Sequence, residues 1–467
     1  MVEYTDVVNT GIAWLPQIPQ HWEVRKLKYA FDERSDKGYP NEPLLVSSQN
    51  MGVVLKSVYG KRTVEALKDL DKLKLVKVGD YVVSLRSFQG GIEYAYYQGI
   101  ISPAYTIMEP HKDCKSDYYK FLFKSAPFIK LLTTCVTGIR EGQNVDYKKL
   151  RNVEIPIPPR AEQDQIVRFL DWKVSKIKKL ISIRRKEIQE LEELKAHAID
   201  KIVIHGLHGS AETQNNDIRW DIDYPSTWKL ERLRNLFTFR KGLSITKANL
   251  EPTGILVISY GQVHSKKNSM VGLNNELFRY VNSSYLKTDP SALVQKGDFI
   301  FADTSEDLDG SGNCAYVDRS DKIFAGYHTV IAHPKEGTDN KYFAYLFKSP
   351  TWRYQIRKKV NAVKVYSITQ QLLKDVFLLV PPQDEQQEIV RYLDSTCVKI
   401  DSLIESTHKK IAELTEMKSV IISDVVTGKI DVCNVTIPEY EHIDNIYDDN
   451  NEDGEETDET ETDGEEA

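Results

Sequence analysis

Two stretches of the chain, PPRAEQDQIVRFLD at 158–171 and PPQDEQQEIVRYLD at 381–394, are identical at 9 of 14 positions with an offset of 223. The apolar residues that follow keep this offset, so that Ile177, Ile181 and Ile188 correspond to Ile400, Ile404 and Ile411. Chance does not produce such a match. One structural element therefore occurs twice in this chain of 467 residues.

The segments upstream of these stretches match at shorter anchor points. IPQHW ending at Trp22 corresponds to YPSTW ending at Trp228, KVGD at 77–80 to QKGD at 295–298, and FLFKS at 121–125 to YLFKS at 345–349. The offsets are 206, 218 and 224, so the second copy carries additional loop residues. We interpret the two segments as diverged copies of one module.

The shared stretch predicts a long helix that begins after the Pro-Pro pair, since proline is tolerated at a helix start and disfavours helix before it. The apolar positions after Ile177 recur with helical spacing. About 40 residues would extend ~60 Å, which requires a partner helix along the length. We predict an antiparallel coiled coil between the two copies. A core helix inside one globular domain is the alternative.

The diverged segments, roughly 15–157 and 220–380, alternate short β-type runs with helical stretches at about 118–132 and 342–359. The β-type runs are DYVVSL, AYTIM, DFIFA, TVIAH and FLLV. The fold class is therefore α+β, with two similar α/β modules separated by two long helices and an internal pseudo-two-fold. The expected boundaries are 1–159 and 207–381 for the modules, 160–206 and 382–430 for the helices, and 431–467 for the tail.

The formal charge of -7 hides an uneven distribution. Residues 444–467 hold 13 acidic groups and no basic one, which leaves +6 for the rest of the chain. A mildly basic body is compatible with a polyanionic ligand. We interpret the tail as a disordered solubilising segment, and a DNA-mimicking switch is the alternative.

The apolar runs, the cysteines and the missing catalytic motifs of the sequence restrict the possible classes of function. No apolar run approaches the roughly 20 residues of a membrane span, and the five scattered cysteines fit neither a disulfide framework nor a zinc ribbon. We therefore expect a cytoplasmic protein. GxxxxGK[ST], GxGxxG, HExxH and GxSxG are absent, and Ile157 and Val380 precede the Pro-Pro pairs where an adenine methyltransferase has Asn or Asp. A metal site assembled across loops remains open.

The order of module, PPxxEQxxIVx[FY]LD signature and long helix, repeated once, resembles the specificity subunit of type I restriction-modification systems. The Trp22 and Trp228 anchors and the two Gly-Asp turns add to the resemblance. It implies two target-recognition domains that bind double-stranded DNA, two methyltransferase subunits docked on the helices, and optional motor-nuclease subunits. It also implies that S-adenosylmethionine, and ATP with Mg²⁺ for restriction, bind to those partners and that this chain binds no cofactor and carries out no catalysis.

Candidate DNA contacts in the first module lie in the RSFQGG turn at 86–91 and in the segment before Pro158. They are Arg86, Ser87, Gln89, Gly90, Arg140, Gln143 and Asn144. Arg pairs with guanine and Gln with adenine in the major groove, and glycines allow close approach of the backbone. A phosphate contact or a surface ion pair is the alternative for Arg86.

At the offset of 218 the second module has an acidic loop, Thr304 to Asp307, in place of the basic turn. Acids accept from cytosine N4 but repel phosphate, so this loop either reads a base edge or lies away from DNA. The candidate DNA contacts of this module are Lys241, Lys247, Tyr260, Gln262, Thr304, Ser305, Lys364, Tyr366 and Ser367.

The repeated helix starts offer candidates for docking of a partner protein. They are Glu162, Gln163, Arg168, Glu385, Gln386 and Arg391. Capping of the helix N-terminus is the alternative role of the carboxylates. Two other functions stay open: a coiled-coil adaptor that joins two proteins without DNA, and a nuclease with an unrecognised metal site.

Overall fold

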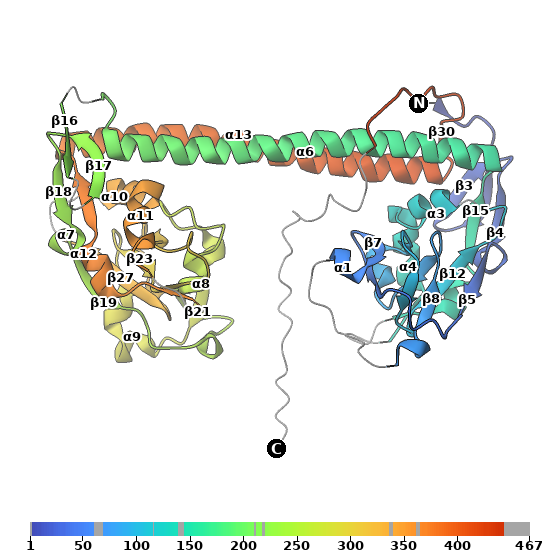
Figure 1. The fold of residues 1–467 in the computed structure, drawn as a ribbon, viewed down its shortest axis with the longest axis horizontal. Helices are drawn as coiled ribbons and strands as arrows, with labels where there is room; N and C mark the ends of the chain where they lie inside the picture. Colours follow the sequence, from blue (N-terminus) through green and yellow to red (C-terminus); the bar gives the residue numbers. More distant parts are fainter. Residues whose placement is uncertain are drawn as a thin grey trace, which may run out of the picture. The chain divides into compact units, whose positions relative to one another are not determined.

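The computed structural model describes residues 2–59, 69–114, 116–138, 144–209, 212–216, 220–335, 340–360 and 365–442. The chain divides into two compact units, Met1–Arg185 with His408–Ala467 and Lys186–Thr407. Two long helices, α6 (Arg160–His205) and α13 (Gln383–Val426), contribute one half each to both units (Figure 1).

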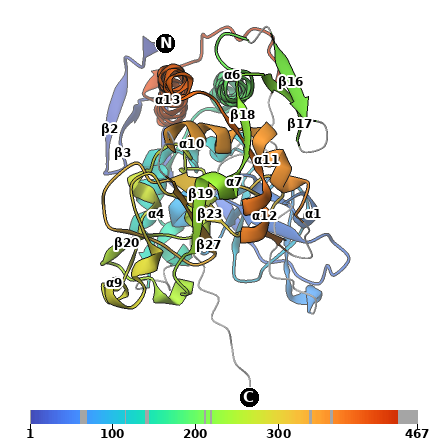
Figure 2. The same ribbon diagram turned by 90° about the vertical axis from the view of Figure 1, so that its left-hand side faces the viewer.

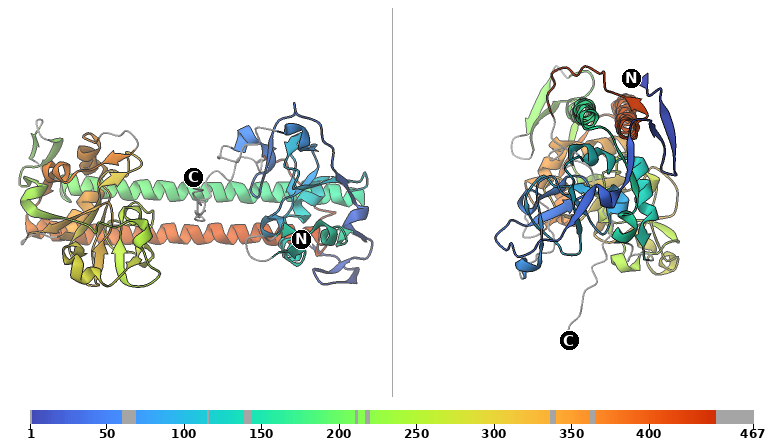
Figure 3. Two further views of the ribbon diagram at one scale, coloured as in Figure 1. Left: turned by 90° about the horizontal axis from the view of Figure 1, so that it is seen from below. Right: turned by 90° about the vertical axis from the view of Figure 1, so that its right-hand side faces the viewer.

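Within each unit the two half-helices pair in antiparallel fashion. In the first unit, Val174 near the start of α6 and Val425 near the end of α13 belong to one apolar core. In the second unit, Lys195 near the end of α6 donates to Asp401 near the start of α13, with Nζ to Oδ1 at 2.5 Å. The right-hand view of Figure 3 shows the two helices end-on, side by side. The predicted antiparallel pairing is confirmed.

The first module is built on a four-stranded antiparallel sheet in the order β10-β9-β12-β5. Its strands are β5 (Phe31–Arg34), β9 (Tyr81–Val83), β10 (Glu93–Tyr94) and β12 (Thr106–Pro110). All three residues of β9 are buried, which fits a strand with both faces covered. A second antiparallel pair joins β4 (Glu23–Lys26) to β15 (Glu154–Ile157), which leads directly into α6.

The second module repeats this plan with β25-β23-β27-β19. These strands are β19 (Phe237–Lys241), β23 (Phe299–Ala302), β25 (Cys314–Tyr316) and β27 (Thr329–Pro334). β18 (Lys229–Arg232) pairs with β29 (Phe377–Val380), which leads into α13. The α+β class and the internal repeat are confirmed, and the five β-type runs all contain strands.

The second module also has a second sheet of four strands, β21-β20-β26-β22. Its strands are β20 (Ile255–Ile258), β21 (Arg279–Val281), β22 (Leu293–Val294) and β26 (Ile323–Ala325). At this place the first module has two separate antiparallel pairs, β6 (Leu45–Ser48) with β7 (Gly52–Leu55) and β8 (Lys74–Val76) with β11 (Gly99–Ile101).

The helical stretches expected at 118–132 and 342–359 are each broken into two helices, which corrects the sequence prediction. They are α3 (Ser116–Leu122) with α4 (Ala126–Thr134), and α10 (Asn340–Lys348) with α11 (Pro350–Arg357). Ser125 and Ser349 have extended backbone and are followed by proline in the first turn. Proline starts a helix but cannot continue one, so the chain restarts there. Figure 2 shows α10 between the helix pair and the sheet of the second module.

The repeated Gly-Asp turn positions an ion pair with a buried aspartate in each module. Gly79 and Gly297 have φ of 93° and 97°, a conformation that glycine adopts without strain. Asp80 accepts from Arg34 Nε at 2.9 Å, and Asp298 accepts from Arg240 Nη2 at 3.1 Å. Each pair ties the turn to the edge strand of the sheet. Among the described residues, no helix is long and apolar enough to cross a membrane.

Candidate nucleic-acid interface

The basic turn of the first module follows β9 and forms the short helix α2 (Ser87–Gly90). Arg86 and Gln89 are exposed at this turn. Ser87 is buried, and its Oγ accepts from the backbone N–H of Ser84 at 2.8 Å. A Cβ on Gly90 would lie 2.8 Å from the Gln49 side chain. Ser87 and Gly90 therefore shape the turn, and Arg86 and Gln89 are the residues that it presents to a ligand.

The second predicted loop of this module lies against the first. β14 (Asn144–Val145) pairs with β13 (Val136–Thr137) and contacts α2. Asn144 is exposed. Two segments that are about 55 residues apart in the sequence thus form one surface around Arg86. Arg140 and Gln143 lie outside the described residues.

The structure also joins the two predicted loops of the second module. β24 (Thr304–Ser305) pairs with β28 (Tyr366–Ser367), with Thr304 opposite Ser367. Ser305 is buried and donates to the carbonyl of Asp307 at 2.7 Å, so it supports the loop from inside. Ser367 is exposed, and Thr304 and Tyr366 are half-buried. Lys364 lies outside the described residues.

The helix α8 (Tyr260–Val263) packs beside this strand pair. His264 directly after it contacts the carbonyl of Thr304, with Nε2 to O at 2.7 Å. Gln262 uses its side chain to cap its own helix, since Oε1 accepts from the N–H of Ser259 at 3.0 Å. Tyr260, in contrast, keeps a half-buried ring at this surface.

An aromatic and histidine cluster surrounds Tyr260 and was not identified from the sequence. The ring centroids of Tyr327 and His328 lie 5.6 and 5.5 Å from that of Tyr260. His328 is exposed, has a φ of 53° and contacts Asp303, with Nδ1 to Oδ1 at 3.2 Å. Burial raises the pKa of Tyr327, while the charge of Lys247 opposes that rise, so Lys247 belongs to the same surface. In the sequence His328 directly precedes the β-type run TVIAH, which by itself indicates a structural position.

The other charged side chains considered in this module are either exposed or paired within the chain. Lys241 is exposed at the end of β19. Directly after the acidic loop, the Asp309 carbonyl accepts from Arg357 Nη2 at 2.6 Å, and Arg353 donates to the same oxygen. These arginines offset part of the negative charge of the loop. Among the described residues, no group of three or more His, Cys, Asp or Glu side chains is arranged to hold a metal ion.

At the helix starts, most of the predicted docking side chains are used inside the chain. Gln163 and Gln386 are buried and donate to the carbonyls of Pro158 and Pro381, each at 2.8 Å. Both side chains are thus occupied within the chain, and their role in docking stays a prediction. The exposed arginines of the signature, Arg168 and Arg391, remain available at equivalent positions.

The glutamates of the signature make a repeated contact with the tryptophan anchors. Glu162 accepts from Trp22 Nε1 at 2.9 Å, and Glu385 accepts from Trp228 Nε1 at 3.0 Å. Gly428 after α13 lies against Trp22, and Gly206 after α6 lies against Trp228. We call each group of glutamate, tryptophan and glycine a latch. Each latch fastens a module to the start of one long helix and the end of the other.

Comparison with known proteins agrees with this architecture. The family described as "Type I restriction modification DNA specificity domain" matches residues 19–194 and 225–416. The Type I restriction enzyme MjaVIII specificity subunit of Methanocaldococcus jannaschii is 23% identical over 436 residues, which cover 90% of this chain and 95% of that protein. The Type I restriction enzyme EcoKI specificity subunit of Escherichia coli (strain K12) is 23% identical over 342 residues, with 69% and 68% covered.

The fold is also found in a solved structure. A chain from a study of complex assembly and conformational transition of the type I R-M system superposes with a TM-score of 0.62 at 16% identity. The superposition covers 88% of this chain and 99% of the other. The shared architecture therefore extends over both modules and both helices.

Proposed function

Because the chain belongs to the family of type I restriction-modification DNA specificity proteins, we propose that each of its two modules reads one half of a bipartite, asymmetric DNA site. Membership in this family makes the chain a non-catalytic subunit for recognition of DNA sequence. Its partners are accordingly DNA and the other subunits of a restriction-modification complex. The division of the site between the modules is the proposal.

One observation carries this proposal. Both modules have the same sheet order and the same Gly-Asp turn, yet the loops that follow their equivalent strands differ. β9 leads to exposed Arg86 and Gln89, whereas β23 leads to Thr304 and the acidic loop. A common scaffold whose loops carry different hydrogen-bonding groups suits two modules that recognise different base sequences.

We assign the docking of two methyltransferase subunits to the long helices. Arg168 and Arg391 are exposed at equivalent positions of α6 and α13, so the repeat offers the same contact twice. S-adenosylmethionine, and ATP with Mg²⁺ for restriction, are assigned to the partner subunits, where the chemistry takes place. This chain binds the DNA site and positions the partner subunits on it.

The test is a selection from random duplex DNA by the chain co-purified with its methyltransferase subunits. We expect enrichment of two short, unrelated sequences separated by a fixed number of unspecified base pairs. A single uninterrupted sequence would contradict two independent readers. Absence of any enrichment would favour the adaptor, which joins proteins without reading DNA.

A further inference from the structure

The chain that follows α13 returns along α6 as an extended segment. After β30 (Ile430–Asp431), residues 432–442 form neither helix nor strand. Val432 is fully buried in the core of the first unit, and Val435 and Ile437 pack against that core. The right-hand view of Figure 3 shows this segment crossing over α6. We call residues 432–442 the strap.

Polar contacts fasten the strap to one face of α6. Gln165 Nε2 donates to the carbonyls of Val432 and Val435 at 3.0 and 2.9 Å. Lys179 Nζ donates to Glu441 Oε2 at 2.8 Å, and both of these side chains are exposed. Exposed ion pairs contribute little to stability, so the outer part of the strap is held mainly through Gln165.

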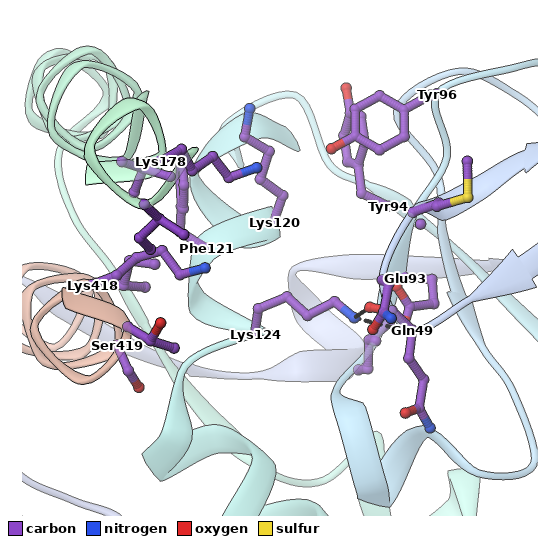
Figure 4. A pocket seen from close by; sticks show the side chains of 18 of the residues that line it. Gln49, Glu93, Tyr94, Tyr96, Lys120, Phe121, Lys124, Lys178, Lys418 and Ser419 are labelled. Atoms are coloured by element: carbon purple, nitrogen blue, oxygen red, sulfur yellow. Dashed lines mark hydrogen bonds and ion pairs between the residues drawn. The ribbon is translucent and has the colours of Figure 1, made fainter. Parts of the chain in front are cut away.

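The face of α6 under the strap differs from the face toward the first module. Lys178 lines a cavity of about 320 Å³ on the module side, together with the ion pair of Lys124 and Glu93 (Figure 4). Lys179, the next residue of the helix, contacts the strap instead. The first module therefore covers one side of α6, and the strap covers another.

The internal repeat shows the same helix face without a strap. The offset of 223 relates Gln165, Arg168, Trp172, Ser175 and Lys179 of α6 to Glu388, Arg391, Ser395, Val398 and Ser402 of α13. These positions recur every three or four residues and form one stripe on each helix. Ser175 is 3% exposed, whereas Val398 is 67% exposed. Glu388 contacts His208 at 3.5 Å and still has 47% of its side chain exposed. The α13 stripe is thus open at the positions that are buried on α6.

The open stripe has the composition of a protein interface. Val398 is exposed, and Tyr392 beside the stripe is 47% exposed. Arg391 is exposed next to Tyr392. Tyrosine and arginine are enriched where proteins bind one another. The stripe carries one acidic and one basic side chain, which does not suit duplex DNA, since phosphate contacts require an excess of positive charge.

We propose that the two stripes are equivalent docking surfaces for the same partner, the methyltransferase subunit, and that the strap competes with this partner for the stripe on α6. The inference rests on the assignment of methyltransferase docking to the long helices and adds that the two surfaces are unequal. A partner seated on Arg391 and Val398 would meet, at the equivalent place on α6, Arg168 bordered by Val435 and Ile437 of the strap. Docking on α6 requires displacement of the strap and is therefore weaker.

The first test compares chains that end at Asn434 and at His442. The shorter chain loses the strap beyond Asn434 but keeps Val432, and the longer chain controls for removal of residues 443–467. Titration with the methyltransferase subunit, followed by native mass spectrometry, gives two stepwise dissociation constants. Two identical, independent sites differ by about fourfold for statistical reasons. We expect a difference above about fortyfold in the wild type and in the chain ending at His442, and about fourfold in the chain ending at Asn434.

The second test keeps the full chain. Gln165→Glu introduces the residue that α13 has at position 388 and removes the donor to both strap carbonyls. We expect it to tighten the weaker binding step at least fivefold and to leave the helix content unchanged by circular dichroism. Gln189→Glu is the matched control, because exposed Gln189 lies further along α6 and bonds Glu193 rather than the strap. It should leave the ratio of the two constants unchanged.

Constants only about fourfold apart in the wild type would overturn the proposal, and so would equal ratios in the two shortened chains. Loss of the second methyltransferase subunit from the folded chain ending at Asn434, or from Gln165→Glu, would make the strap part of the docking surface and also overturn it. Equal docking at both stripes would leave the proposed function intact. Absence of any methyltransferase binding would instead refute docking on the helices, and the role of the strap with it.

Discussion

Removal of the Glu162 carboxylate should destabilise the first unit more than the matched change destabilises the second. In Glu162→Ala the buried indole N–H of Trp22 loses its acceptor, and Tyr4 and His21 lose their contacts with the same carboxylate. An unpartnered buried donor costs about 1–3 kcal/mol. The His21 side chain is 51% exposed and can rehydrate, so it adds little. We expect a total loss of about 2–3 kcal/mol.

The repeat supplies the control. Glu385→Ala removes the acceptor of Trp228, but Glu385 is half-buried and water can replace the carboxylate. We expect a loss of about 1 kcal/mol. Glu162→Gln keeps an oxygen that Trp22 can donate to and should recover most of the stability.

The measurement is thermal unfolding followed by circular dichroism and tryptophan fluorescence. For a unit of this size, 1 kcal/mol corresponds to roughly 2–4 °C, so Glu162→Ala should melt about 4–12 °C lower. Assembly with methyltransferase subunits is measured in parallel. An unchanged melting temperature combined with lost assembly would refute the latch and restore Glu162 to the docking surface.

Three further predictions concern single features of the chain. Arg86→Ala should relax base preference in one half-site only, at a cost of about 1–3 kcal/mol, as read from selection; equal weakening for all sequences would make Arg86 a phosphate contact. Burial raises the pKa of Glu93 to about 7, so its folded form holds a proton more tightly than its unfolded form and stability falls as pH rises toward 7. Urea unfolding at pH 5 and pH 8 should therefore show that the stability of Glu93→Gln relative to the wild type increases at the higher pH, by no more than about 3 kcal/mol. A stability difference that does not depend on pH would contradict this. Removal of residues 443–467 should strengthen non-specific DNA binding less than about threefold at physiological salt, because screening is effective beyond ~8 Å; a gain above tenfold would instead support a DNA-mimicking tail.

The long helices and the repeated modules could be predicted from the sequence because their signals are local or duplicated. Helical periodicity after Pro159 and Pro382 needs no tertiary information. The breaks between the paired helices also have a local signal, because Pro127 and Pro350 lie in the first turns of α4 and α11. The single helices expected at 118–132 and 342–359 did not take this signal into account.

The candidate site could be predicted only in part, because it depends on contacts between distant segments. Pairing of Thr304 with Ser367 joins residues that local patterns treat separately. The signature glutamines were docking candidates because they recur at both helix starts, and only the fold shows Gln163 and Gln386 turned onto prolyl carbonyls. His328 adjoins a β-type run in the sequence, and only the fold shows it exposed, with a left-handed backbone, in the turn between β26 and β27.

The division of the DNA site between the modules is tested most directly by photocrosslinking. The selected duplex would carry 5-iododeoxyuridine in one half-site at a time, bound to the chain with its methyltransferase subunits, and crosslinked peptides would be identified by mass spectrometry. We predict that one half-site crosslinks only to peptides of the first module, around Arg86 and Asn144, and the other only to peptides of the second, around Tyr260 and Tyr366. Crosslinks from both half-sites to the same module would contradict the account.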